Sequence, residues 1–130
     1  MLACAEVHES RYGRELIVDG TFASLYVPGQ GATRSVWDAI AAPVLALPAE
    51  RRRRFLFLGL AAGSAARVVR AVAPAAELVG VEIDRDVLRV ARRSFGLDAL
   101  GIEVLRDDAL PVLERERRSF DAVFDDVFVG

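Results

Sequence analysis

The sequence predicts an α/β fold with a parallel sheet, because short apolar segments alternate with helical ones through most of the chain. The first apolar segment, 55–58, leads through a turn of small residues and a helical segment to a second, 78–81, which ends at the carboxylate of Glu82. This order makes one right-handed βαβ unit. Two further apolar segments, 101–105 and 120–128, each follow a helical segment and extend the predicted sheet to four strands.

The first part of the chain predicts a small β element. A hairpin is predicted over 16–26, because the pair Asp19-Gly20 between two apolar segments is a strong turn signal. A preceding strand is predicted around 6–10. We therefore expect an N-terminal β element over 1–30 and a partial α/β domain over 31–130.

The composition limits the class of protein and the kinds of partner that we expect. The chain has 130 residues, of which 53% are hydrophobic and 28% charged, a globular composition at the length of one domain. A formal net charge of −2 gives no overall field that would recruit nucleic acid or an anionic membrane, so neither is expected as a partner. The sequence has no signal peptide and no apolar run of about 18 residues, so we expect a cytoplasmic protein.

Several chemistries are excluded by residue types that are rare or missing. All 17 basic residues are arginine, and the absence of lysine excludes a P-loop and Schiff-base catalysis. Cys4 is the only cysteine and His8 the only histidine, so an intramolecular disulfide is excluded and no metal site is expected. His8 is expected at the surface or in packing rather than in catalysis.

The turn at 59–64, after the first strand of the βαβ unit, has features of a ligand-binding turn. Gly59 can adopt backbone angles closed to other residues, and Gly63 allows a ligand or the helix to approach the main chain closely. Glu82 lies 19 residues beyond Gly63, about the spacing at which an acid reaches ribose hydroxyls. Ala61 stands where a dinucleotide-binding turn has its second glycine, and the alternative is a tight turn that binds nothing.

The segments 58–67 (Leu-Gly-Leu-Ala-Ala-Gly-Ser-Ala-Ala-Arg) and 81–84 (Val-Glu-Ile-Asp) resemble the S-adenosylmethionine-type Rossmann fold. Within that fold they resemble the spermidine synthase family of aminopropyltransferases, and the likeness extends over 14–130. The resemblance implies that the glycine turn holds the amino-acid end of the cofactor and that an acid binds the ribose. We therefore expect the cofactor at Gly59, Ala61, Gly63, Glu82 and Ile83.

The predicted strand 101–105 is followed by two acids, Asp107 and Asp108. A carboxylate at a strand end can accept a hydrogen bond from the exocyclic amine of adenine. The resemblance assigns this role to Asp108, with Ala109 beside the ring. An alternative, compatible with the first, is that the two acids cap the helix predicted over 109–117.

Asp126 is the candidate catalytic residue. The resemblance implies that an aspartate at this position helps to deprotonate the attacking amine, which an ammonium requires because it has no lone pair. The alternative is a residue at the cofactor's edge. The sequence departs from the family twice: Ala23 replaces a glutamine that meets the cofactor, and 127–130 replaces a Ser-Ser-Asp-Pro segment, so the second aspartate is missing.

The remaining segments carry structural predictions. Thr33 or Ser35 is expected to cap a helix whose apolar face includes Trp37. Trp37 is expected in the core or an interface, with a substrate pocket as the alternative. Arg67 is expected to point outward from the helix of the βαβ unit, and Asp84 is expected to cap the next helix.

Three functions follow from these expectations. The first is a transferase that binds an S-adenosyl nucleoside and moves an aminopropyl group from decarboxylated S-adenosylmethionine to a small amine, releasing methylthioadenosine. The second is a methyltransferase that uses S-adenosylmethionine and releases S-adenosylhomocysteine. The third is a non-catalytic nucleoside-binding or interaction module, because fold alone does not establish chemistry.

The predicted sheet has the strand order 3-2-1-4, as the resemblance implies, and ends on a hydrophobic strand. An unpaired strand at a sheet edge tends to pair with another chain. The chain could be a fragment or have a tail that is disordered or lost, or a partner chain could cover this edge. We expect a homodimer that covers it.

Overall fold

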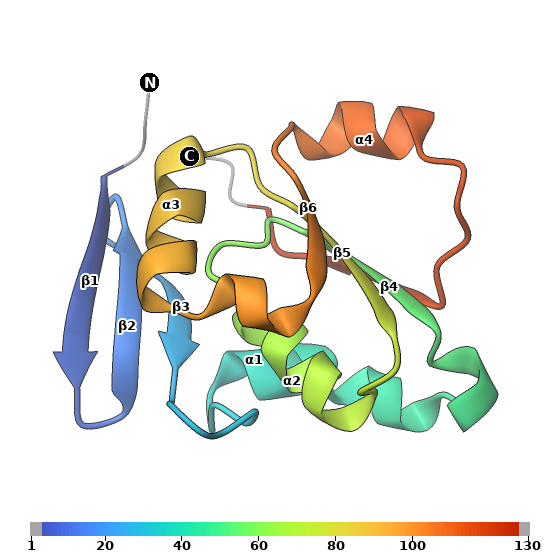
Figure 1. Cartoon of the computed structure of the whole chain (residues 1–130), viewed down its shortest axis with the longest axis horizontal. Coiled ribbons are helices and arrows are strands. Elements are labelled where there is room, and N and C mark those ends of the chain that lie inside the picture. Colours follow the sequence, from blue (N-terminus) through green and yellow to red (C-terminus); the bar gives the residue numbers. More distant parts are fainter. Residues whose placement is uncertain (1–3, 128–130) are drawn as a thin grey trace.

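Two sheets organise the chain, whose computed structural model describes residues 4–127 (Figure 1). The small antiparallel sheet has the order β1-β2-β3 and consists of β1 (Ala5–Ser10), β2 (Gly13–Val18) and β3 (Thr21–Tyr26). The parallel sheet has the order β6-β5-β4-β7 and consists of β4 (Arg54–Leu58), β5 (Glu77–Val81), β6 (Ile102–Leu105) and β7 (Ala122–Asp125). Numbered along the chain within this sheet, the order is 3-2-1-4. The predicted α/β fold and strand order are therefore confirmed.

Within the described residues, four α-helices connect and cover the parallel strands: α1 (Val36–Ala41), α2 (Ser64–Val72), α3 (Arg85–Ser94) and α4 (Ala109–Arg115). Short 3-10 helices η1 (Ala42–Ala46), η2 (Ala49–Arg51) and η3 (Leu97–Leu100) join them. The helix predicted around Trp37 changes to 3-10 geometry after Ala41, where Pro43 stands at the start of η1 and has no N–H for an α-helical hydrogen bond. The predicted strand 120–128 is shorter than expected, because β7 ends at Asp125, and residue 128 lies outside the described residues.

The parallel sheet buries both of its faces. On one face the side chains of Phe55, Phe57 and Leu78 pack in the main core with residues of α1, α2 and α3. On the other face Leu56, Leu58, Val79 and Val81 pack against Val112 of α4. Alternate residues of each strand point to opposite faces, so a strand covered on both sides must be continuously apolar. This explains the uninterrupted apolar segments in the sequence.

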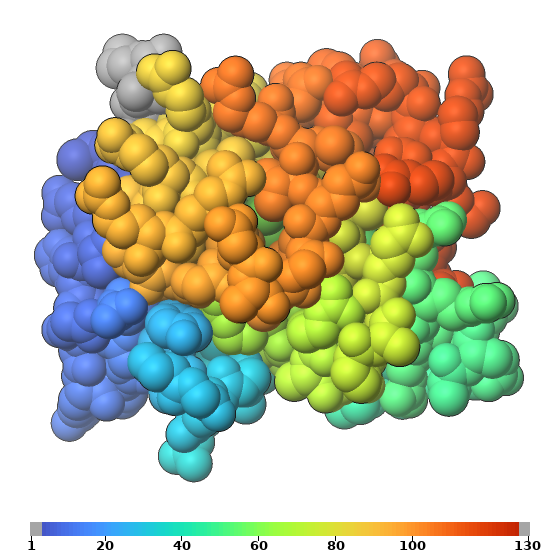
Figure 2. Space-filling view, in the orientation of Figure 1, coloured from blue at the N-terminus to red at the C-terminus, as the bar shows by residue number. Residues whose placement is uncertain are grey.

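The small sheet shares the main core, to which it contributes Leu16 and Ala23. Its atoms abut those of α3 in the space-filling view (Figure 2). Arg14 of β2 crosses this junction, and its Nη1 donates to the carbonyl of Ser94 at 2.6 Å. A cation near the last carbonyls of a helix is favourable, because these carbonyls lack partners within the helix. The end of α3 therefore anchors the N-terminal strands.

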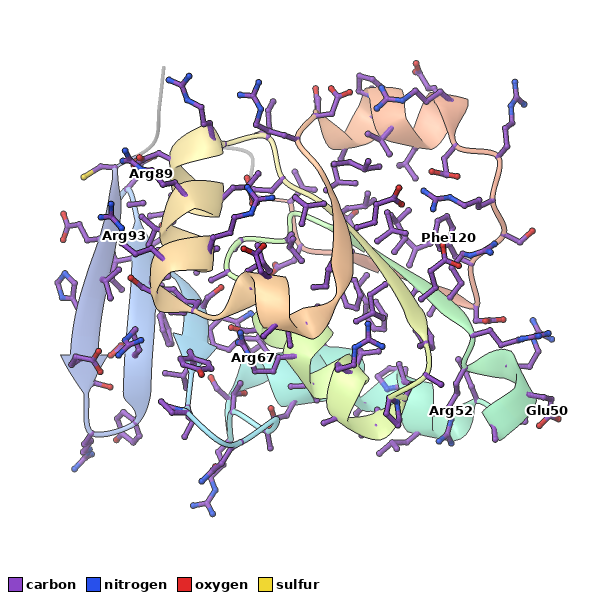
Figure 3. All side chains as sticks on the ribbon, viewed as in Figure 1. Glu50, Arg52, Arg67, Arg89, Arg93 and Phe120 are labelled. Carbon is purple, nitrogen blue, oxygen red and sulfur yellow. The ribbon has the colours of Figure 1, made fainter. Side chains whose placement is uncertain are left out.

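Arg67 does not point outward, and this prediction was wrong. The side chain is 8% exposed, and its guanidinium lies 4.5 Å from the centre of the Tyr26 ring. It also donates to the carbonyl of Phe95, just beyond α3. The small sheet covers this flank of α2, which periodicity within one helix cannot reveal. Arg89 and Arg93 of α3, labelled in Figure 3, are by contrast exposed.

Both predicted N-cap positions are occupied as expected, by Asp84 at α3 and Ser35 at α1, but only Asp84 caps through its side chain. The Asp84 carboxylate caps α3 by accepting from the N–H groups of Asp86 and Val87 at 2.8 and 3.0 Å. At α1 the N-cap residue is Ser35, but neither its hydroxyl nor that of Thr33 caps the helix. Instead Asp38, inside the first turn, accepts from the N–H and Oγ1 of Thr33 at 2.7 and 2.6 Å. The start of α1 is therefore held by Asp38, a residue of its own first turn.

Candidate functional site

The candidate site lies at the carboxyl edge of the parallel sheet. The register places Leu58 beside both Val81 and Asp125, so these three strands end at the same level. The strand order reverses at this point: β5 and β6 lie on one side of β4, and β7 lies on the other. Open α/β sheets bind ligands outside the carboxyl ends of their strands at such a reversal. The chain reaches this edge at the end of each parallel strand, at Gly59, Glu82, Asp107 and Asp126.

A cavity of about 90 Å³ opens at this edge, and its lining includes five of the predicted cofactor residues: Gly59, Glu82, Ile83, Asp108 and Ala109. Val81, Asp107 and Val127 complete the lining. We call it the nucleoside cavity. Three carboxylates, those of Glu82, Asp107 and Asp108, therefore line one hollow together with apolar side chains. This arrangement can accept hydrogen bonds from hydroxyl and amino groups and can cover a flat ring.

Glu82 is held in place by the main chain. Its Oε1 accepts from the N–H of Ala61 at 2.9 Å, and its Oε2 accepts from the N–H of Asp84 at 3.1 Å. An ionised carboxylate has about four acceptor positions, so two remain for a ligand. Ala61 adopts a positive φ of 48°, which is uncommon for a residue other than glycine and aims its N–H at Glu82. The glycine turn thus orients the acid predicted to bind ribose.

Gly59 is required where the end of β7 passes over the turn. Its φ is 76°, and a Cβ added there would lie 2.5 Å from the carbonyl oxygen of Asp126. The Asp126 N–H in turn donates to the carbonyl of Leu58 at 2.9 Å. The atoms that the Cβ would meet belong to the backbone of Asp126 and Val127, which cannot move aside without breaking this pairing. The glycine therefore brings the candidate catalytic residue to the edge of the nucleoside cavity.

Gly63 lies where the start of α2 meets η3, and not at the nucleoside cavity. It is the N-cap of α2 with a φ of 84°, and a Cβ added there would meet Leu97 at 3.0 Å and Leu100 at 3.5 Å. The close approach that it allows is therefore the approach of η3. Gly63 is not part of the lining of the nucleoside cavity.

Asp108 lines the nucleoside cavity from the segment between β6 and α4. It occupies the N-cap position of α4, but its carboxylate makes no capping hydrogen bond. Asp107 instead accepts from the N–H of Asp108 at 2.7 Å and pairs with Arg115 at the same distance. The hydrogen bond from Arg115 holds the pKa of Asp107 below its ordinary value. The alternative in which both acids cap the helix through their side chains is therefore wrong, and the Asp108 carboxylate can accept from a ligand.

Asp126 lines a second, smaller hollow of about 20 Å³, which we call the Asp126 crevice. Its walls are mostly apolar and include Trp37, Phe57 and Phe124, and it shares Gly59 with the nucleoside cavity. Phe57 and Phe124 stack with ring centres 4.9 Å apart. Trp37 is 4% exposed, so it is a core residue that also borders the crevice. Burial, and secondarily the charge of Asp125, raise the pKa of Asp126.

Replacement of Asp126 by asparagine is expected to make protein stability less sensitive to pH. A carboxyl group whose pKa is higher in the folded than in the unfolded state binds its proton more tightly when folded. Stability of the wild type therefore falls as pH rises through the ordinary carboxyl range towards neutrality, and Asp126→Asn removes this loss. Thermal unfolding over a pH series should show the variant more stable at neutral pH and matched to wild type at acid pH. An equal difference at every pH would contradict the assignment.

Two serines that support the site were missed at the sequence level. The Oγ of Ser24 in β3 accepts from the N–H of Ala62 at 3.0 Å, inside the glycine turn. The Oγ of Ser64 accepts from the N–H of Leu25 and donates to its carbonyl, both at 2.9 Å. Both serines are 1% exposed, and these hydrogen bonds satisfy their buried hydroxyl groups. A serine directly after Gly63 was the one available signal, but its partner is 39 residues away.

Comparisons with known proteins agree with this geometry at the level of the fold. A scan of protein-family models and a search of curated proteins each gave no match. Among solved structures, a probable spermidine synthase from Corynebacterium glutamicum ATCC 13032 superposes with a TM-score of 0.82 at 27% identity, over 98% of this chain and 50% of that one. The spermidine synthase from Thermotoga maritima gives 0.73 at 17% identity, over 96% and 43%.

A third solved structure is a spermidine synthase in complex with the transition-state analogue AdoDATO. It gives a TM-score of 0.69 at 15% identity, over 98% of this chain and 44% of that one. The chain therefore has an α/β, Rossmann-like fold with an N-terminal antiparallel sheet. Over the part that it spans, the chain resembles spermidine synthases in fold, and it spans half or less of the length of the three solved structures.

Two properties of the described residues bear on its surroundings. Across residues 4–127, every helix is too short or too polar to span a bilayer. The same residues contain no cluster of three or more His, Cys, Asp and Glu side chains able to hold a metal ion.

Proposed function

We propose that this domain binds an S-adenosyl nucleoside in the nucleoside cavity and transfers an aminopropyl group from decarboxylated S-adenosylmethionine to a small amine. The observation that carries the proposal is the meeting of Glu82, Asp108 and Gly59 at one cavity, where the strand order reverses. The solved structures that this chain resembles are spermidine synthases, one of them in complex with a transition-state analogue. This likeness supports the same choice of donor.

The residues of the cavity fit the polar groups of a nucleoside. Glu82 offers two remaining acceptor positions to the two ribose hydroxyls, and its orientation is set by Ala61 and Asp84. Asp108 offers acceptors to an exocyclic amine. Ile83 lines the cavity and is 64% exposed, so it presents apolar surface there. A flat ring over Ile83 would remove this surface from water.

Asp126 is proposed to act as the general base that deprotonates the acceptor amine. When bound, the donor supplies a carbon activated by the neighbouring sulfonium. The carboxylate of Asp126 accepts a proton from the amine, and its raised pKa brings it closer to the neutral range where general bases are effective. The mostly apolar walls of the Asp126 crevice reduce the contact of this carboxylate with water. The crevice adjoins the nucleoside cavity at Gly59, so the amine and the activated carbon meet near this glycine.

The proposal is tested by product analysis. The domain is incubated with decarboxylated S-adenosylmethionine and putrescine, and methylthioadenosine is measured by chromatography. Amine-dependent release that is lost in Asp126→Asn but kept in Asp98→Asn, an exposed aspartate on η3, is the expected result. S-adenosylhomocysteine formed from S-adenosylmethionine and an acceptor would instead indicate methyl transfer. Failure to form either product would remove the transferase proposal for this domain.

A second function, a nucleoside-binding module without transferase activity, is favoured by one observation. The Asp126 crevice holds only about 20 Å³, close to the space of a single water molecule. An amine acceptor would need this crevice to open or to be completed by further protein. Binding of methylthioadenosine without any product formation would favour this function.

We also propose that a second copy of the chain covers β7. Within the described residues β7 pairs only with β4, so its other side presents unpaired main-chain groups. Val123 and Val127 beside this edge are 49% and 44% exposed. Light scattering at high protein concentration should show a dimer. Monomeric behaviour there would contradict this proposal.

A further inference from the structure

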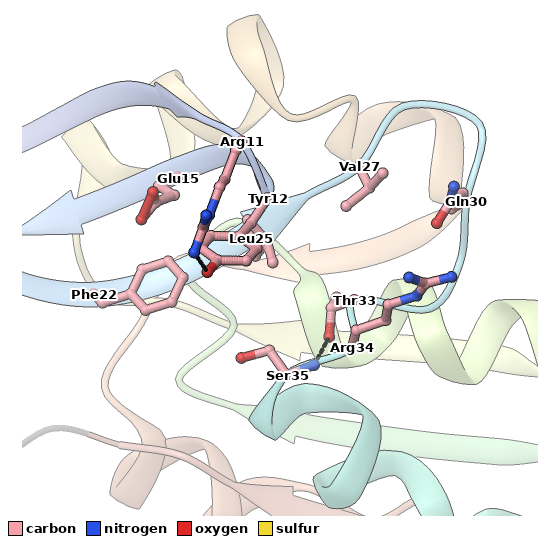
Figure 4. A pocket seen from close by; sticks show the side chains of 10 residues that line it. All are labelled: Arg11, Tyr12, Glu15, Phe22, Leu25, Val27, Gln30, Thr33, Arg34 and Ser35. Carbon is pink, nitrogen blue, oxygen red and sulfur yellow. Dashed lines mark hydrogen bonds between the residues drawn. The ribbon is translucent and has the colours of Figure 1, made fainter.

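A further hollow lies away from the candidate site. It is a cavity of about 650 Å³ between the N-terminal strands and the loop that leads to α1 (Figure 4). We call it the hairpin cavity. Its lining shares no residue with the nucleoside cavity or the Asp126 crevice. The volume lies in the range of roughly 300–1,000 Å³ that small-molecule sites occupy.

The hairpin cavity has an apolar side. Leu25 and Val27, of β3 and the residue after it, line the hollow with Phe22. Phe22 is 42% exposed, and its ring meets the Trp37 ring edge-on, with centres 5.1 Å apart. A ring held in this way keeps one face available to a ligand. An apolar group placed there would gain the free energy of removing this surface from water.

The charged groups of the cavity are two guanidiniums and one carboxylate. Arg11 and Tyr12 reach in from the β1–β2 turn, where the Arg11 guanidinium donates to the Tyr12 hydroxyl (Figure 4). Arg34 enters from the loop on the other side, and Glu15 of β2 is the only acid in the lining. Neither arginine forms an ion pair with Glu15 among the described contacts. The lining therefore carries one net positive charge.

Arg34 is fixed in an unusual backbone conformation. Its φ is 56°, and the Asp38 carboxylate accepts from its N–H at 2.8 Å while also holding Thr33. Non-glycine residues in this region are uncommon and are usually held by their surroundings. Its guanidinium makes no hydrogen bond or ion pair within residues 4–127. Figure 4 shows this guanidinium on the side of Gln30.

We propose that the hairpin cavity binds a small monocarboxylate with an apolar body. The carboxylate binds the Arg34 guanidinium, which offers paired N–H donors that match two carboxylate oxygens. The apolar body lies on Phe22 and Leu25. One negative charge neutralises the net charge of the lining, whereas an amine of the same shape would add to it. The proposal is independent of the transferase function, because the two sites share no residue.

The test uses 3-phenylpropionate as the probe and Trp37, the only tryptophan of the chain, as the reporter. Trp37 touches Phe22, so ligand binding at Phe22 should change its fluorescence. The expected result is saturable binding that weakens about tenfold or more in Arg34→Gly, the loss expected for one charge-assisted contact. Glycine suits the positive φ, so this variant removes the guanidinium without straining the loop. Arg93→Ala removes an exposed arginine from α3 and should bind as wild type does.

Two further arms keep the test decisive. 3-Phenylpropylamine, with the same body and the opposite charge, should not bind. Phe22→Ala should weaken binding of the carboxylate when the titration is followed by calorimetry, and circular dichroism checks that each variant is folded. Equal binding of the amine, or unchanged binding in folded Arg34→Gly, would overturn the proposal. Absence of saturable binding by the wild type would overturn it as well.

Discussion

Replacement of Gly59 by alanine is expected to lower the free energy of unfolding by about 3 kcal/mol, from backbone strain and overpacking together. The φ of Gly59 is 76°, and the new Cβ would lie 2.5 Å from the carbonyl oxygen of Asp126. Relief requires the end of β7 to move away from β4. The same movement would open the nucleoside cavity, so nucleoside binding is expected to be lost in this variant.

Gly29→Ala is the matched control for this prediction. Its φ is 78°, nearly the same as that of Gly59, but a Cβ added there meets nothing within 4 Å. It should cost only the strain of the left-handed conformation, about 1–2 kcal/mol. Urea unfolding of both variants measures the difference, which isolates the contact with β7. Equal losses would contradict the close approach of Asp126 to the glycine turn.

Replacement of Phe95 by alanine is expected to lower the free energy of unfolding by about 3–5 kcal/mol. The Phe95 side chain is 0% exposed and packs in the main core, and its ring centre lies 6.3 Å from that of Tyr26. Its carbonyl also accepts from the buried Arg67. Truncation would therefore leave a cavity where α3, α2 and the small sheet meet. The loss is large beside the total stability of roughly 5–15 kcal/mol that is usual for a domain.

Phe22→Ala is the control of the same residue type. Phe22 is 42% exposed, so its truncation removes less buried surface and should cost under about 1.5 kcal/mol. Urea unfolding followed by circular dichroism measures both variants. A Phe95→Ala loss no larger than that of Phe22→Ala would contradict the shared core of the two sheets.

The sequence predicts the part of the fold that depends on local order along the chain. The central strands β4 and β5 contain the uninterrupted apolar segments 55–58 and 78–81, and the acids that follow the parallel strands meet at one edge because these strands end together. The family resemblance implied a ligand role for both Glu82 and Asp108, and both line the same cavity. Asp84 was recognisable as a cap because capping depends on its own neighbours.

The features that could not be predicted depend on contacts between distant segments. Arg67 appeared to lie on the polar side of α2, but the small sheet covers that side and supplies Tyr26. The role of Ser24 depends on a backbone N–H at Ala62, and no local pattern signals it. The hairpin cavity is formed by a turn, two strands and a loop, and its lining residues follow no periodic pattern in the sequence.

The central claim is that Glu82 and Asp108 hold a nucleoside at the carboxyl edge of the parallel sheet. Calorimetric titration with methylthioadenosine tests it most directly, with Glu82→Gln as the site variant and Glu50→Gln, an exposed acid on η2, as the control. We predict saturable one-to-one binding by the wild type and by Glu50→Gln, weakened at least about tenfold in Glu82→Gln because a charged acceptor is lost. Absence of binding by the wild type, or equal affinity in all three proteins, would contradict the account.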